Sequence, residues 1–182
     1  MNQFRKLNKP TFLDRIWNLS RRFFYLNNKI KKNSYFEFGS YLYRFKKNIN
    51  FESNVYIKRN SIIGCANKDA IVSIGKNTTI GNGSIIISSE KIIIGKDCML
   101  APYVHIVDSN HGMESDKPYN QQENYTSPVS IGDNSWIGSG VVILPGVSIG
   151  SGSIVGAGSV VTKSFPENSK IMGIPAKEKD KQ

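Results

Sequence analysis

Cysteine is scarce in this chain of 182 residues, which contains only Cys65 and Cys98. Two cysteines cannot provide the disulfide framework of a small secreted domain, and no apolar stretch with a small-residue cleavage site opens the sequence. No apolar run approaches the length of about 20 residues that a membrane-spanning helix needs. We therefore expect a cytoplasmic domain that can lie on a membrane surface but does not cross the membrane.

Acidic residues are few in the N-terminal third, so the net charge of +10 is unevenly distributed. Residues 1–59 contain 14 Lys and Arg against 3 Asp and Glu, whereas residues 60–182 contain 10 against 11. Residues 11–32 place apolar side chains at three- and four-residue steps behind Thr11, a suitable N-cap, which predicts an amphipathic basic helix. This helix can pack on the rest of the protein, or residues 1–32 can contact the anionic inner face of the cell membrane. No recognised motif accompanies the charge, so we expect no nucleic-acid partner.

An aliphatic residue, by contrast, recurs at every sixth position. In the second half of the chain these residues are Ile131, Ile137, Ile143, Ile149, Val155 and Val161. The same period occurs upstream at Ile74, Ile80 and Ile86, and again at Ile94, Leu100 and Ile106. An α-helix repeats every 3.6 residues, so a period of six instead indicates short strands joined by tight corners, with one aliphatic side chain per strand in a narrow interior. Three strands form one coil, and stacked coils form a parallel β-helix.

Small or β-branched residues stand two positions before the aliphatic ones, and strand alternation predicts that they point inward as well. They are Ser135, Val141, Val147, Ser153 and Ser159.

The six-residue period stops between Ile106 and Ile131. The intervening residues are polar and contain two prolines, so we expect a loop over about residues 109–128 to leave the coil. Both histidines of the chain stand near its start, in the sequence HIVDSNHGME that begins at His105. The register places His105 on an outer face, as an ordinary solvated or interface residue, and His111 at the start of the loop.

At these repeats, over about residues 50–177, the chain resembles the hexapeptide-repeat acyltransferases, which are left-handed β-helices. The run SIGDNSWIGSGVVILPGVSIGSGSIVGAGSVVTKSFPENSKIMGIPAK, which ends at Lys177, is most similar to the sugar and polysaccharide O-acetyltransferases. We expect an all-β, left-handed parallel β-helix over residues 34–177, preceded by the helical segment 1–33 and followed by a tail at 178–182. The resemblance also implies a homotrimer with active sites between subunits.

The resemblance implies transfer of an acetyl group from acetyl-CoA to a hydroxyl of a sugar or cell-surface polysaccharide. In this family the catalytic base is the His of D-x-N-H-G, which is His111 in residues 108–112 here. A neutral imidazole can take the proton of a hydroxyl as the hydroxyl attacks the acetyl thioester. Asp108 and Asn110 either orient this ring or only stabilise the turn, and the alternative for His111 is an ordinary loop histidine.

Acetyl-CoA is thus the expected co-substrate, and the resemblance indicates where it would bind. The backbone N–H of Ser139 would stabilise the oxyanion that develops on the acetyl carbonyl. Ala157 would contact the pantetheine arm. The other residues implied to contact the donor are Trp136 beside the arm and, at the nucleotide and its phosphates, Thr162, Lys163 and Lys177. The alternative is that all of these are ordinary corner and surface residues.

A covalent route would need Cys65 or Cys98 as the nucleophile. Cys98 lies two positions before Leu100, where a buried thiol is expected and its thiolate is disfavoured. We therefore favour direct transfer in a ternary complex.

Three other functions are weighed against O-acetylation. N-acetylation of an amino sugar, free or linked to a nucleotide, is the nearest, because a histidine base serves an amine as well as a hydroxyl. A non-catalytic β-helix that acts as a scaffold or binding module is the second. A zinc enzyme like the β-helical carbonic anhydrases is disfavoured, because three histidine ligands cannot be drawn from two histidines, and we expect no metal.

Overall fold

The computed structural model describes residues 33–114 and 116–179, together with Phe12, Leu13 and Ile16. The predicted basic helix over residues 11–32 therefore lies mostly outside the described residues, as does the end of the predicted tail. Within the part of the chain that is described, no helix is long and apolar enough to cross a membrane.

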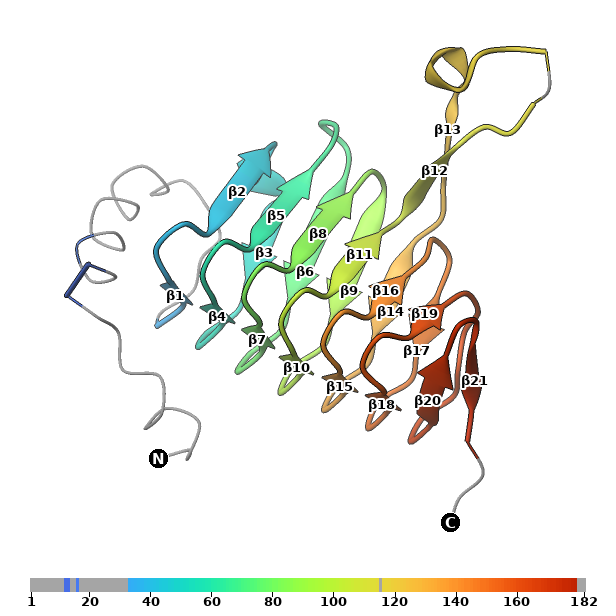
Figure 1. Ribbon diagram of the computed structural model, residues 1–182. Helices are drawn as coiled ribbons and strands as arrows, with labels where there is room; N and C mark the ends of the chain where they lie inside the picture. Colours follow the sequence, from blue (N-terminus) through green and yellow to red (C-terminus); the bar gives the residue numbers. More distant parts are fainter. Residues whose placement is uncertain (1–11, 14–15, 17–32, 115, 180–182) are drawn as a thin grey trace.

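Short strands wind the described residues into six stacked coils (Figure 1). The first three coils contain β1 (Tyr35–Phe36), β2 (Tyr41–Arg44) and β3 (Ile49–Phe51); β4 (Tyr56–Ile57), β5 (Ile62–Cys65) and β6 (Ile71–Ile74); and β7 (Thr79–Ile80), β8 (Ile85–Ser88) and β9 (Lys91–Ile94). A 3-10 turn, η1 (Lys46–Asn48), lies in the first coil.

The remaining coils are interrupted once. They contain β10 (Met99–Leu100), β11 (His105–Val107) and β14 (Val129–Ile131); β15 (Trp136–Ile137), β16 (Val142–Ile143) and β17 (Ser148–Ile149); and β18 (Ile154–Val155), β19 (Val160–Val161) and a bridge from Phe165 to Ile149. The antiparallel pair β20 (Lys170–Gly173) and β21 (Ala176–Glu178) closes the structure.

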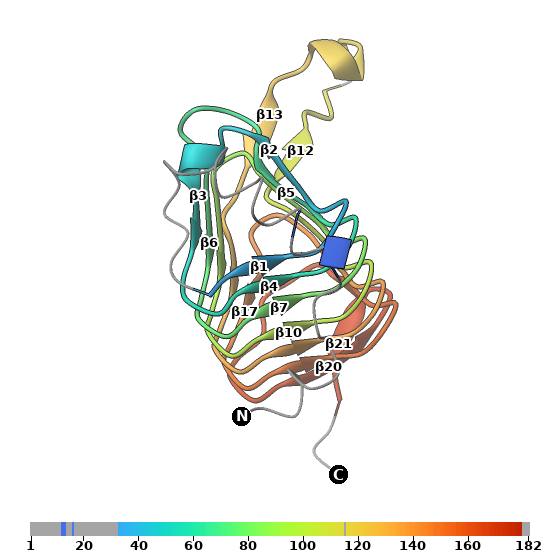
Figure 2. The ribbon, with the colours of Figure 1, turned by 90° about the vertical axis from the view of Figure 1, so that its left-hand side faces the viewer.

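The strands stack into three parallel sheets that form the faces of a prism (Figure 2). Sheet A contains β3, β6, β9, β14 and β17; sheet B contains β1, β4, β7, β10, β15, β18 and β20; and sheet C contains β2, β5, β8, β11, β16 and β19. The fold predicted from the period and the resemblance, a left-handed parallel β-helix, is confirmed.

The predicted interior positions are all buried. Every aliphatic residue of the period is at most 2% exposed, and so is each small residue two positions earlier. Burying one such aliphatic side chain contributes about 1.5–3 kcal/mol to stability. The buried serines remain hydrogen-bonded, because Ser135 and Ser159 donate to the carbonyl oxygens of Gly132 and Gly156 at 2.8 and 2.7 Å. The interior therefore accepts small polar side chains beside the aliphatic ones.

Glycine after an aliphatic residue allows neighbouring coils to approach each other. A Cβ added to Gly138 would lie 2.5 Å from the backbone nitrogen of Ala157 in the next coil, closer than a real Cβ comes to another atom. The close contact explains why the period carries Gly directly behind Ile137.

The chain turns at three edges, each named after the two sheets that meet there. The B–C edge includes residues 101–104, 138–141 and 156–159; the C–A edge includes residues 144–147 and 162–164; and the A–B edge includes residues 95–98 and 132–135.

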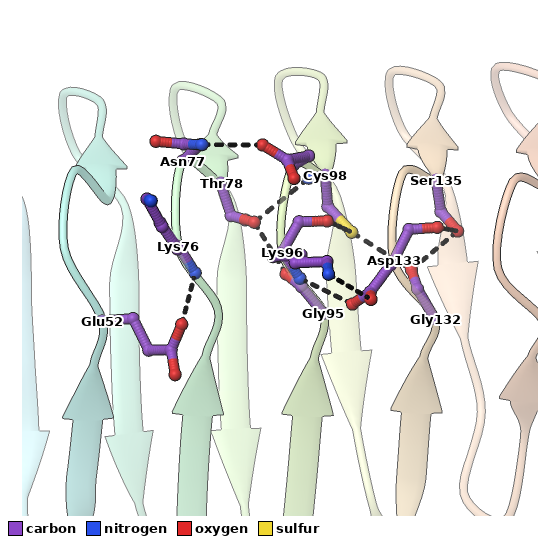
Figure 3. A network of polar contacts seen from close by, with 11 residues as sticks. Glu52, Lys76, Asn77, Thr78, Gly95, Lys96, Cys98, Gly132, Asp133 and Ser135 are labelled. Atoms are coloured by element: carbon purple, nitrogen blue, oxygen red, sulfur yellow. Dashed lines mark hydrogen bonds and ion pairs between the residues drawn. The ribbon is translucent and has the colours of Figure 1, made fainter.

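Side chains of the A–B edge form a polar ladder between coils (Figure 3). Asp133 accepts the backbone N–H of Lys96 at 2.9 Å, and its other carboxylate oxygen lies 3.6 Å from Lys96 Nζ. Two coils further along this edge, Glu52 accepts the backbone N–H of Lys76 at 3.0 Å. Exposed ion pairs of this kind contribute only about 0–1 kcal/mol each. The polar side chains of this edge are therefore explained by the contacts they make between stacked coils.

The segment over residues 109–128 leaves the coil as predicted, at the C–A edge, and its base is paired into a hairpin (Figure 1, yellow). It contains the antiparallel strands β12 (Ser109–His111) and β13 (Asn124–Thr126), with a 3-10 turn η2 (Tyr119–Gln121) near its tip. Three-residue polar strands bury nothing, so the sequence gives no alternation by which to recognise them.

Candidate functional site

The two histidines lie on different elements. His105 is exposed on β11, where it stands in the outer row of sheet C between Ile85 and Val142, as its register predicts. His111 is exposed on β12, where Asn124 of β13 is its cross-strand partner. The first histidine belongs to a coil and the second to the extruded hairpin.

Asp108 fixes the root of the hairpin. Its buried carboxylate accepts the Ser88 hydroxyl at 2.7 Å and the backbone N–H groups of residues 89, 90 and 91 at 2.6, 3.0 and 2.7 Å. Its carbonyl oxygen accepts the N–H of Ser127 at 2.8 Å, where the chain returns from the hairpin. Among the described residues the carboxylate bonds to this corner and not to His111. The contacts favour the alternative in which Asp108 stabilises the turn.

Gln122 holds the hairpin beyond His111. Its side-chain oxygen accepts the N–H of Glu114 at 2.8 Å, and its side-chain nitrogen donates to the carbonyl oxygens of Glu114 and Lys117 at 2.9 and 2.7 Å. Gly112 donates its N–H to Glu123 at 2.9 Å, and a Cβ there would meet Gln122 at 2.7 Å. His111 thus lies between two hydrogen-bonded braces.

Ser139 and Ala157 lie exposed on the B–C edge in successive coils. The carbonyl of Ser139 accepts the N–H of Gly158 at 2.8 Å. The N–H groups of Ser139 and Ala157 themselves donate to no other described residue. The equivalent corner of the preceding coil carries Pro102, which has no N–H. Two open backbone donors therefore follow each other along this edge, the kind of group that binds an oxyanion or an amide carbonyl.

The other residues predicted to contact the donor are spread over three places. Trp136 is 48% exposed on the outer face of sheet B. Thr162 and Lys163 are exposed on the C–A edge, and Lys163 Nζ lies 5.6 Å from the centre of the Phe165 ring. Lys177 is exposed on β21.

One chain does not bring all of these residues together. His111 extends from the C–A edge, whereas Ser139 and Ala157 occupy the B–C edge. The whole width of sheet C separates these two edges (Figure 2).

Neither cysteine is a candidate nucleophile. Cys65 and Cys98 are 0% and 2% exposed. Burial raises the pKa of the Cys65 thiol to about 11 and also raises the pKa of Cys98. Cys98 lies inside the A–B edge, where its sulfur is 3.2 Å from the carbonyl oxygen of Gly132 (Figure 3). Both thiols therefore stay protonated and enclosed at neutral pH.

Several residues that shape the hairpin lie outside the six-residue period and cannot be recognised from the sequence. No motif marks residues 88–91, which donate hydrogen bonds to Asp108. The same holds for Gln122, which holds the hairpin together beyond His111. Asn124 is recognised only from the pairing of β12 with β13. Among the described residues, no group of three or more His, Cys, Asp and Glu could hold a metal ion.

Two family models match the chain. The model described as the hexapeptide repeat of succinyl-transferase matches residues 71–101, and the bacterial transferase hexapeptide model matches residues 128–163. Both matches fall on coils of the β-helix.

Known proteins also resemble the chain. A Dictyostelium discoideum protein named as an acetyltransferase is 48% identical over 106 residues, 58% of this chain and 55% of that protein. The galactoside O-acetyltransferase of Escherichia coli is 39% identical over 106 residues, 58% and 52% of the two chains. The chain thus spans about half the length of these curated relatives.

Solved structures share the fold. A maltose O-acetyltransferase from Clostridium difficile is 38% identical with a TM-score of 0.57, over 79% of this chain and 69% of that chain. AntD, an N-acyltransferase from Bacillus cereus in complex with dTDP and 3-hydroxybutyryl-CoA, has a TM-score of 0.75 over 87% and 86% of the two chains. At 21% identity the second likeness concerns the fold alone.

Proposed function

Because the chain belongs to the hexapeptide-repeat acyltransferase family, we propose that it transfers an acetyl group from acetyl-CoA to a hydroxyl of a sugar or cell-surface polysaccharide. The observation that carries the proposal is an exposed His111 on a hairpin braced at both ends. Relatives named as galactoside and maltose O-acetyltransferases support a sugar acceptor.

In the proposed mechanism, His111 is the general base. Its neutral imidazole removes the proton of the acceptor hydroxyl while the hydroxyl oxygen bonds to the acetyl carbonyl carbon. The N–H of Ser139 stabilises the oxyanion of the tetrahedral intermediate. When the intermediate collapses, the carbon–sulfur bond breaks, and the imidazolium returns its proton to the thiolate of coenzyme A. The buried cysteines favour this direct transfer in a ternary complex over an acetyl-enzyme.

Acetyl-CoA is proposed to lie along the B–C edge. The open N–H of Ala157 suits an amide carbonyl of the pantetheine arm, and Trp136 would flank the arm. Thr162, Lys163 and Lys177 are proposed to contact the nucleotide and its phosphates. Replacing both lysines by Ala should then raise the KM for acetyl-CoA, and an unchanged KM would exclude these phosphate contacts.

A homotrimer is proposed, because the hairpin of one subunit and the B–C edge of another can complete a site that one chain leaves divided. The outer row of sheet C is mostly aliphatic and supports such a contact. Val142→Glu in this row should dissociate the assembly in sedimentation velocity, whereas Ser148→Glu on sheet A should not. A monomer with full activity would refute the shared site.

The catalytic proposal is tested by acetyl-CoA turnover with maltose, galactosides, nucleotide-linked amino sugars and extracted glycans. His111→Ala should abolish turnover, while His105→Ala, the matched histidine on a coil, should retain it. Full turnover in His111→Ala would refute the general base. If no acceptor promotes turnover by the wild type, the scaffold alternative is favoured.

N-acylation is the second candidate, since AntD, an N-acyltransferase, shares the fold. Mild alkali separates the two reactions, because an O-acetyl ester is hydrolysed and an N-acetyl amide is not. Loss of the acetyl label from the product under alkali would favour the O-acetyl assignment.

Residues 1–32 are proposed to place the enzyme at the inner face of the cell membrane, because the positive charge of the chain is concentrated there. In a flotation experiment, the whole chain should rise with anionic vesicles, whereas a chain that lacks these residues should not. Equal flotation of the two chains would end this proposal.

A further inference from the structure

We propose that Asn124 positions the imidazole of His111, an inference that rests on the proposed role of His111 as the base. The two residues are direct partners in the register of β12 and β13. Neither the D-x-N-H-G motif nor the six-residue period includes Asn124.

The hydrogen bonds of the hairpin show which kind of antiparallel pair His111 and Asn124 form. Gly112 donates its N–H to the carbonyl of Glu123 at 2.9 Å, and Ser127 donates to Asp108 at 2.8 Å. Hydrogen-bonded and non-hydrogen-bonded pairs alternate along an antiparallel ladder. His111 and Asn124 are therefore a non-hydrogen-bonded pair, in which the Cα atoms are about 4.5 Å apart and the side chains approach most closely.

The two faces of the hairpin distinguish Asn124 from the other polar residues near His111. His111 and Asn124 share one face, because directly paired residues project to the same side. Asn110, the neighbour named by the motif, is paired with Tyr125 on the opposite face. Ser109 is on the face of His111, but its hydroxyl is already within 3.0 Å of the Ser89 hydroxyl. Asn124 is thus the polar side chain directly beside His111.

A carboxamide suits a general base that must stay neutral. The side-chain oxygen of Asn124 can accept a hydrogen bond from one ring N–H, which leaves the other nitrogen free to receive the hydroxyl proton. The same oxygen still accepts when the ring becomes an imidazolium, and that bond is then charge-assisted. A carboxylate in this place would add a negative charge that favours the imidazolium, whereas an amide adds no charge.

The inference is tested on the full-length chain with Asn124→Ala and Asn124→Asp. Tyr125→Phe is the matched control, because it alters the adjacent residue of the same strand on the opposite face. In 15N spectra of the imidazole, the wild type and the control should favour one neutral tautomer of His111, and Asn124→Ala should mix the two tautomers. This readout needs neither an acceptor nor turnover.

With acetyl-CoA and maltose or a galactoside as probes, Asn124→Ala should lower kcat by about 10- to 100-fold at unchanged KM, which is a part of what a positioned general base contributes. Asn124→Asp keeps an oxygen that can accept the ring N–H, so it should recover most of kcat, whereas a merely structural role would not make kcat depend on an acceptor at this position. The added charge should also move the acidic limb of the pH–rate profile to higher pH. A midpoint of thermal unfolding equal to that of the wild type verifies that each variant is folded.

Two results would overturn the inference. One is an unchanged tautomer with a raised KM for the acceptor, which would make Asn124 an acceptor contact. The other is a wild-type tautomer together with wild-type kcat in Asn124→Ala. Either result leaves the proposed function intact as long as His111→Ala is inactive. An active His111→Ala would refute the proposed function itself.

Discussion

The stacked coils and the extruded hairpin follow different physical rules. In the coils, the inward side chain at each step of the period is buried, and each coil is held by its neighbours. In the hairpin, His111 and all three residues of β13 are exposed, and hydrogen bonds accepted by Asp108 and donated by Gln122 replace a core. Stability is therefore concentrated in the coils, and the hairpin can carry chemistry without supporting the fold.

Among substitutions that compare the two regions, Ile143→Ala should destabilise the protein most. Ile143 is 0% exposed between Ile106 and Val161 of the adjacent coils, so the substitution should lower the free energy of unfolding by about 2–5 kcal/mol. Tyr119→Ala on the hairpin, where the side chain is 70% exposed, should change it by less than about 0.5 kcal/mol. Chemical denaturation at one fixed protein concentration measures both values. Equal losses would show that the hairpin supports the fold after all.

A smaller effect is expected where the two regions join. Asp108→Asn replaces an acceptor of four hydrogen bonds with a group that also presents N–H donors to the corner, at an expected cost of about 1–3 kcal/mol. Because this corner holds the hairpin, kcat should fall as well. Ser88→Ala, which removes one donor and keeps the carboxylate, should cost less in both measurements. Wild-type stability and kcat in Asp108→Asn would show that the hairpin does not depend on this corner.

The smallest effect is expected from thiol alkylation of the native coils. Burial raises the pKa of both thiols, so the reactive thiolate is scarce at pH 8, and iodoacetamide should leave acetyl-CoA turnover unchanged. Mass spectrometry should find Cys65 and Cys98 unmodified until the chain is unfolded. Rapid alkylation with loss of turnover would reopen the covalent route.

The outer faces of the sheets show why part of the site could not be predicted. Sheet A carries Asn50, Ser73, Ile93, Ser130 and Ser148 in one outer row, whereas sheet C carries Tyr41, Ile62, Ile85, His105, Val142 and Val160. The interior restricts only the inward positions, so outward residues follow no period. Their neighbours become known only when the coils are stacked.

The two strands of the hairpin escaped prediction for a related reason, although the extrusion of the segment itself was predicted. A short polar strand has neither a buried face nor a period, so residues 109–128 were expected to be a loop. The motif drew attention to the segment around His111, but it also suggested that Asn110, its neighbour in sequence, could orient the ring. On a strand, sequence neighbours point to opposite faces, whereas Asn124, thirteen residues later, projects from the same face as His111.

The six-residue period alone predicts the β-helix, its inward residues and the place where the coil opens, because a narrow core imposes this period on the chain. Which side chains meet outside that core follows from the folded structure. It directed Asp108 to the corner of residues 88–91, paired His111 with Asn124, and placed Ser139 on a different edge from the hairpin. These contacts depend on strand register and on the stacking of coils, which join residues far apart in the chain.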